Sequence, residues 1–169
     1  MSLIESAEAF ARAKNADVDF CRGIAFRLKS IGVIDEQVLC CAFLCHAKSG
    51  FDEIHARFGR EIATYVASIS KDLTLPKQKQ EEQYVKQLQD APWESILIKL
   101  CEISANLKVL KDSELSKTKR TKALKQNIHY LIALKKKILE NRTKTPGIER
   151  LLEGANETLA HFKQRPITF

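Results

Sequence analysis

The sequence predicts an all-α protein, a single helical bundle of about eight or nine helices. Apolar residues recur at spacings of three and four along most of the chain, and no sustained run alternates apolar with polar residues. Glycine and proline interrupt this pattern at intervals that suit helices of ordinary length. No internal repeat, low-complexity tract or linker divides the chain, so we expect one domain over residues 1–169.

Five helices are expected in the first part of the chain, over residues 3–14, 17–30, 35–47, 51–58 and 60–70. Ser2 and Asp35 are suitable N-caps for the first and third, and Gly32 is a suitable stop after the second. The third helix is almost wholly apolar from Val38 to Cys45. A helix without a polar face is usually surrounded by protein, so we expect this one to be central.

Proline marks the helices of the second part, which are expected over residues 76–89, 93–110, 116–141 and 148–162. Pro76 and Pro92 suit helix starts, because a proline ring fits the first turn but not the interior. Thr145-Pro146-Gly147 is a turn before the last helix. The expected core joins the second, third, fifth and seventh helices through Phe20, Ile24, Leu39, Phe43, Leu44, Ile62, Val66, Leu97, Leu100 and Cys101.

The composition indicates a protein of a reducing compartment. The five cysteines are odd in number and lie mostly on apolar helix faces, so we expect free thiols and no disulfide. No apolar run approaches the roughly 18 residues of a membrane span, and the N-terminus lacks the basic start of a secretory signal. We therefore expect a cytoplasmic protein without a membrane partner.

The net charge of +7 is concentrated in one segment. Residues 108–144 carry 12 Lys and Arg against three acidic residues, and helical spacing places several of these bases on an outward stripe. Lys119, Arg120, Lys122 and Lys125 are the candidate face for a polyanion, which would bind by releasing counterions. Tyr130 is the only aromatic residue nearby, so base stacking is not indicated, and a solvated helix is the simpler interpretation.

Three stretches of the chain resemble the HD-domain phosphohydrolases, in particular the RelA/SpoT-like enzymes that remove pyrophosphate from (p)ppGpp. They are Ala42 to His46, the run from Phe58 to Ser70, which fits F-G-x-x-I-A-x-x-V-x-x-I-[ST], and Lys99 to Asn106. The resemblance covers residues 3–112 and implies a helical bundle of the HD type, with the basic C-terminal helices 116–163 beyond it. It also implies a divalent metal, usually manganese, and a nucleotide substrate.

The positions that the resemblance assigns to the metal ligands do not hold them. The family's first histidine falls on Phe20, its His-Asp pair falls on Cys45 and His46, and its last aspartate falls on Glu102. The acidic pair that handles the attacking water falls on Ser49 and Gly50. Only Asn15 to Asp19 lies where the family has a basic loop for the substrate phosphates.

Other residues near these positions leave alternatives open. Cys21, Cys45, His46 and Glu102 could form a soft zinc site, although neighbouring cysteines on a buried helix are more often small apolar residues. Cys45 could be a nucleophile with His46 or His55 as base, but adjacent helical residues diverge by roughly 100°. Glu102 and Asn106 share a helix face and could line a cleft, or Glu102 could pair with Lys99.

These observations predict a catalytically degenerate HD-domain protein that binds a nucleotide or a protein partner and holds no metal. Two alternatives remain. One is a manganese- or zinc-dependent nucleotide phosphohydrolase with a site rebuilt around Cys45, His46 and Glu102. The other is a nucleic-acid or polyanion binder that uses the basic C-terminal helix. The sequence does not indicate an oligomeric state.

Overall fold

The computed structural model describes residues 1–169 and contains nine α-helices, one short 3₁₀-helix and no strand. The all-α prediction is therefore confirmed. The helices are α1 (Leu3–Ala13), α2 (Val18–Ser30), α3 (Glu36–Leu44), α4 (Phe51–Phe58), α5 (Arg60–Ser68), α6 (Lys77–Asp90), α7 (Trp93–Lys111), α8 (Lys117–Asn141) and α9 (Ile148–His161), with the 3₁₀ turn η1 at Arg142–Lys144.

The helix caps follow from local chemistry. Ser2 and Glu5 form a reciprocal capping box at α1, and the Asp35 carboxylate accepts a hydrogen bond from the Gln37 amide at α3. Gly59 has φ +92° between α4 and α5, a backbone conformation that a residue with a side chain adopts only under strain. The expected breaks at Gly32 and Gly59 are thus confirmed.

Two helices end earlier than the sequence predicts. The third helix was expected to reach residue 47 but ends at Leu44, and the fifth was expected to reach residue 70 but ends at Ser68. In both cases the next amides bond to carbonyls three residues back, as His46 does to Phe43 and Ser70 does to Ala67. This tighter geometry ends the α-helix, so apolar periodicity overestimates both lengths.

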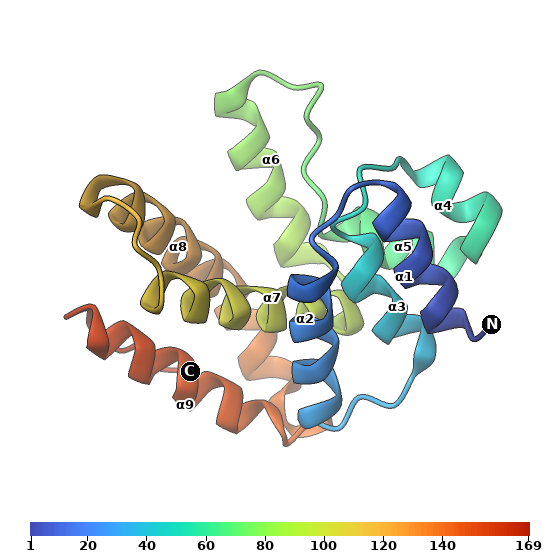
Figure 1. The fold of residues 1–169 in the computed structure, drawn as a ribbon. Helices are drawn as coiled ribbons and strands as arrows, with labels where there is room; N and C mark the ends of the chain where they lie inside the picture. Colours follow the sequence, from blue (N-terminus) through green and yellow to red (C-terminus); the bar gives the residue numbers. More distant parts are fainter.

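α7 is the central helix of the bundle. It packs against α2, α3 and α5 on one side and against α8 and α9 on the other. Figure 1 shows this division, with α1 to α5 grouped at the N-terminal side, α8 and α9 at the C-terminal side, and α6 standing above α7. None of the helices has the length and apolar character that crossing a bilayer requires.

A cluster of 43 buried apolar residues fills the space between these helices. The side chains of α3 from Val38 to Leu44 are all buried, which confirms that this helix is central. Of the ten residues predicted for the core, only Phe20 is not fully buried. It lies at the edge of the cluster, because its ring packs against His46 on the wall of a cavity.

Candidate functional site

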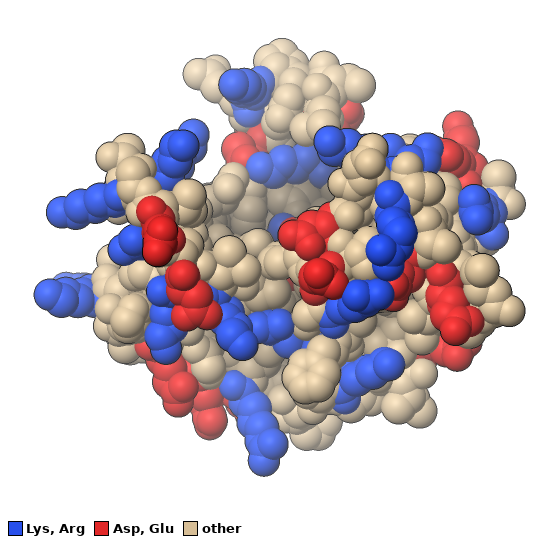
Figure 2. Space-filling view, viewed as in Figure 1, with Lys and Arg blue, Asp and Glu red and all other residues tan.

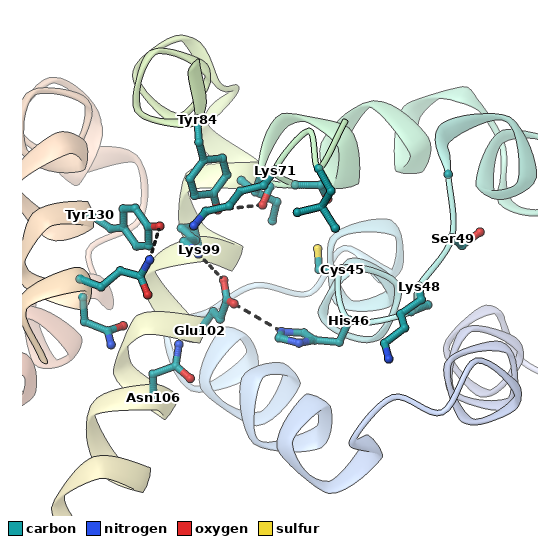
Figure 3. Close-up of a pocket in the computed structure, with 17 residues that line it drawn as sticks. Cys45, His46, Lys48, Ser49, Lys71, Tyr84, Lys99, Glu102, Asn106 and Tyr130 are labelled. Carbon is teal, nitrogen blue, oxygen red and sulfur yellow. Dashed lines mark hydrogen bonds and ion pairs between the residues drawn. The ribbon is translucent and has the colours of Figure 1, made fainter. Parts of the chain in front are cut away.

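A cavity of about 700 Å³ opens where the two halves of the bundle meet below α6. Figure 2 shows this hollow in the surface, with basic side chains in its wall. The cavity is lined by the end of α3 and the loop after it, by the loop between α5 and α6, and by α6, α7 and α8. Figure 3 shows the lining residues, among them Cys45, His46, Lys48, Ser49, Lys71, Tyr84, Lys99, Glu102, Asn106 and Tyr130.

The early end of α3 places His46 in this cavity. Because the helix stops at Leu44, the chain turns through Cys45 and His46 into the loop that leads to α4. Gly50 is the N-cap residue of α4, and Ser49 donates from its hydroxyl to the Glu53 carboxylate at 2.6 Å. Glu53 also pairs with Lys14 at 2.7 Å, so this carboxylate is engaged at the rim.

Glu102 is the centre of the polar network in the cavity. One carboxylate oxygen accepts a hydrogen bond from Lys99 Nζ at 2.9 Å, and the other lies 3.5 Å from His46 Nε2 (Figure 3). The structure therefore shows both arrangements considered from the sequence: Glu102 pairs with Lys99, and Glu102 and Asn106 line the cavity.

Lys99 is a buried cation. Only 6% of the residue is exposed, and its ammonium lies 4.9 Å from the Tyr130 ring centroid and 5.3 Å from that of Tyr84. Burial disfavours the charge, but Glu102 and the Tyr84 hydroxyl outweigh it and raise the pKa of Lys99. Lys99 thus carries a fixed positive charge at neutral pH.

A second lysine faces the same pair of tyrosines. Lys71 is ion-paired with Glu81, and its ammonium lies 5.3 Å from the Tyr84 centroid and 5.5 Å from the Tyr130 centroid. The two rings pack edge to face with centroids 5.3 Å apart. Two ammonium groups therefore flank one aromatic pair, an arrangement in which each cation is attracted to the ring electrons.

His46 is in contact with Phe20, the residue at the family's first-histidine position. Their ring centroids are 5.3 Å apart at an interplanar angle of 76°, an edge-to-face contact. Burial lowers the pKa of His46, and the negative charge of Glu102 only partly opposes this effect. His46 is consequently neutral at pH 7.

The stability of the fold should depend on pH through His46. The pKa of His46 in the folded protein lies below its ordinary value of 6.5. At pH values between these two pKa values, the unfolded chain therefore binds more protons than the folded protein. The stabilisation from neutral His46 is therefore complete above about pH 6.5 and is lost as pH falls through the folded pKa. In denaturant unfolding at several pH values, H46Q should lose less free energy of unfolding on acidification than the parent does.

The control is H129Q, which changes an exposed histidine and should lose stability with acid as the parent does. Equal pH profiles for H46Q and H129Q would contradict a lowered pKa of His46.

The cysteines near the cavity are protonated thiols. Burial raises the pKa of Cys45 well above its ordinary value, and it raises that of Cys21 to about 11. All five cysteines are unpaired, as expected from the sequence. Because the thiolate is the reactive form, Cys45 is poorly suited to act as a nucleophile.

The residues of the site do not fit a divalent metal. No three His, Cys, Asp or Glu side chains come together in a group that could hold one. Glu102 is engaged by Lys99, the imidazole of His46 lies against Phe20, and the thiols of Cys21 and Cys45 are protonated. A metal would have to displace a buried cation before it could bind here.

The candidate basic face of α8 is exposed at three of its four residues. Lys119, Lys122 and Lys125 are exposed. Arg120 is partly buried and donates to the carbonyls of Ser113 and Leu115 at 3.3 and 3.1 Å. These two bonds hold the loop between α7 and α8, and the role of the four residues in binding a polyanion stays a prediction.

Sequence reasoning missed the part of the cavity that α6 and α8 build. Lys71, Tyr84, Gln126, Asn127 and Tyr130 all line it. No motif links these residues, because they come from three separate elements. The sequence offers only a weak indication that these residues belong to a site. Lys71, Tyr84 and Tyr130 stand in segments whose other residues are mostly polar and are expected to be exposed.

Comparison with solved structures finds a similar fold in another protein. The fold superimposes with a TM-score of 0.77 on a metazoan ortholog of SpoT that hydrolyses ppGpp and plays a role in starvation responses. The match covers 96% of this chain and 97% of that one at 17% sequence identity. No protein-family model and no curated protein matches the sequence. The chain therefore has the fold of the HD-domain, SpoT-type ppGpp hydrolases, and the resemblance seen in its motifs is confirmed at the level of fold.

Proposed function

We propose that this protein binds an anionic, nucleotide-type ligand in the cavity below α6 and does not hydrolyse it. The observation that supports this most is the charge of the cavity. Its lining contains the lysines Lys48, Lys71 and Lys99, and its only acidic residue is Glu102. Glu102 is paired with Lys99, and Glu81, which lies just outside the lining, is paired with Lys71. Lys48 is therefore the cation that leaves the cavity with a net positive charge, which favours a phosphate-bearing ligand.

The polar residues around these lysines suit a ligand larger than phosphate alone. Asn106, Gln126 and Asn127 line the cavity with amide groups, which can both donate to and accept from the edge of a nucleobase. A volume of about 700 Å³ falls within the range of sites for nucleotide-sized molecules. The position of the cavity at the end of α3 is also where the family resemblance implies the substrate site.

The same residues argue against hydrolysis. A hydrolase of this type uses a metal to generate the attacking water and a carboxylate to handle its proton. Here Glu102 is held by Lys99, Ser49 and Gly50 supply no carboxylate, and neutral His46 lies against Phe20. The neutral base of the cavity is His46, and its Nε2 is buried beside Glu102, with no free carboxylate and no group of metal ligands placed to supply it with an activated water.

Ligand affinity should depend on Lys71. Calorimetric titration with ppGpp, GDP and ATP should show binding to the parent protein, and K71Q should weaken it. A hydrogen bond to a charged group contributes about 1.5–3 kcal/mol, which corresponds to about 10- to 100-fold in affinity. K86Q, which removes an exposed lysine of α6, is the matched control and should bind like the parent. Equal affinities for K71Q and K86Q would contradict the proposal.

Turnover should be absent. Incubation of the protein with the same nucleotides and manganese should release phosphate or pyrophosphate only at the background rate. The alternative of a phosphohydrolase rebuilt around Cys45, His46 and Glu102 predicts metal-dependent release that H46A or E102Q abolishes. That outcome would replace the binding proposal with an enzymatic one.

A further inference from the structure

The outward surface of α8 carries two exposed apolar residues beside a third that packs at the edge of the core. Ile132 is 57% exposed and Leu139 is 47% exposed, and Ile128 is partly buried at the edge of the core. The buried side of the same helix, which includes Leu131, Leu134 and Ile138, already accounts for its packing in the bundle. The exposed residues therefore have no role in holding the fold.

These three residues form one stripe. With about 100° per residue, Ile128, Ile132 and Leu139 fall within about 40° of one another around the helix axis. The stripe extends over about 16 Å, which is three helical turns. This is the spacing by which an amphipathic helix contacts another helix.

Basic residues accompany the stripe along its length. Lys125 and Lys136 are exposed and lie within about 40° of Ile132 around the axis. The only acidic residue of the helix is Glu140, which lies 3.9 Å from Lys136. Figure 2 shows Lys and Arg side chains projecting from the side of the molecule that α8 forms.

A groove continues the stripe toward the start of α8. It has a volume of about 290 Å³ and is lined by Leu124 and Phe162, with Lys117, Arg120 and Lys125 around them. Leu124 precedes Ile128 by one turn, so the groove and the stripe are neighbours on the same helix. An apolar residue of a partner could be held there within a basic rim.

We propose that this surface of α8 docks an acidic amphipathic helix of another protein. The apolar stripe and the groove give such a helix a surface for its leucine-type side chains, and the lysines complement its carboxylates. Nucleic acid would use the lysines but not the stripe. A second copy of this chain would bring like charges together, which disfavours self-association through this face. The surface is separate from the cavity, so it functions whether or not a nucleotide binds there.

The experiment uses a synthetic acidic amphipathic helix of about five turns, with leucine on one face and glutamate on the other. Fluorescence anisotropy should show saturable binding that weakens with salt, and a peptide of the same composition in scrambled order should bind weakly. I132S/L139S should reduce affinity about tenfold or more, because central apolar contacts carry much of an interface's energy. F26S changes an apolar residue of α2 that is 71% exposed and should leave affinity unchanged.

Four outcomes would overturn the proposal. The designed and scrambled peptides could bind alike, or I132S/L139S could bind as well as F26S. Alternatively, vesicles of anionic lipid or duplex DNA could bind more tightly than the peptide with the same dependence on Ile132 and Leu139. A dimer in sedimentation that I132S/L139S dissociates would likewise assign the surface to a second copy. Failure of this test leaves the nucleotide titrations unaffected, because Lys71 and Lys99 lie in a different part of the molecule.

Discussion

Replacing Phe43 with alanine is expected to lower the free energy of unfolding by about 3–5 kcal/mol, the range for removing a buried phenylalanine. Phe43 is 2% exposed and lies in α3, which packs against α1, α2, α5 and α7. A void at this point removes contacts with several helices at once, and a close-packed core relaxes only in part. Chemical denaturation of the purified variant measures the effect.

Phe51 offers a matched control for this substitution. It is 42% exposed on α4, so F51A removes the same side chain from the edge of the protein. We expect a change well below that of F43A. If the two variants lost similar stability, α3 would not be the centre of the fold and the bundle described above would be wrong.

Replacing Glu102 with alanine is expected to have a similarly large effect, for an electrostatic reason. The substitution leaves the Lys99 ammonium buried without its carboxylate, and breaking a buried pair in this way costs about 3–5 kcal/mol. The tyrosine rings that flank Lys99 offset only part of this, since such contacts contribute about 2 kcal/mol when desolvated.

The control for E102A is E82A, which removes the partner of Lys86 from an exposed pair at 3.3 Å on α6. Exposed pairs contribute about 1 kcal/mol or less, so E82A should unfold almost like the parent. The double variant K99M/E102L should recover much of the loss, because it removes both charges together. Equal stabilities for E102A and E82A would show that the Lys99–Glu102 pair does not stabilise the interior.

The fold was predictable from sequence because its signals are local. Apolar spacing, the N-caps Ser2 and Asp35, and the stops at Gly32 and Gly59 each act within a few residues. The ends of α3 and α5 were not predictable in the same way. There the chain changes from α-helical to tighter hydrogen bonding within an apolar sequence, and no side chain marks the change.

The site was predictable only where motifs cover it. The resemblance singles out four positions, Phe20, Cys45, His46 and Glu102. The structure brings all four together: Phe20 packs against His46, and His46 lies near Glu102. Cys45 lies in the wall of the same cavity. Lys71, Tyr84 and Tyr130 complete it from distant parts of the chain. These residues come together because of the way α6 and α8 pack across α7. No residue spacing in the sequence indicates that packing.

A protein that only binds its ligand should hold no metal at this site, and elemental analysis of the purified chain tests this directly. The protein should be prepared without chelator and without a metal-affinity resin, then supplied with zinc or manganese and freed of excess. The donor set described here predicts a substoichiometric metal content that is the same for the parent, C45A and H46A. A stoichiometric zinc or manganese ion that is lost in C45A or H46A would contradict it and favour the phosphohydrolase with a rebuilt site.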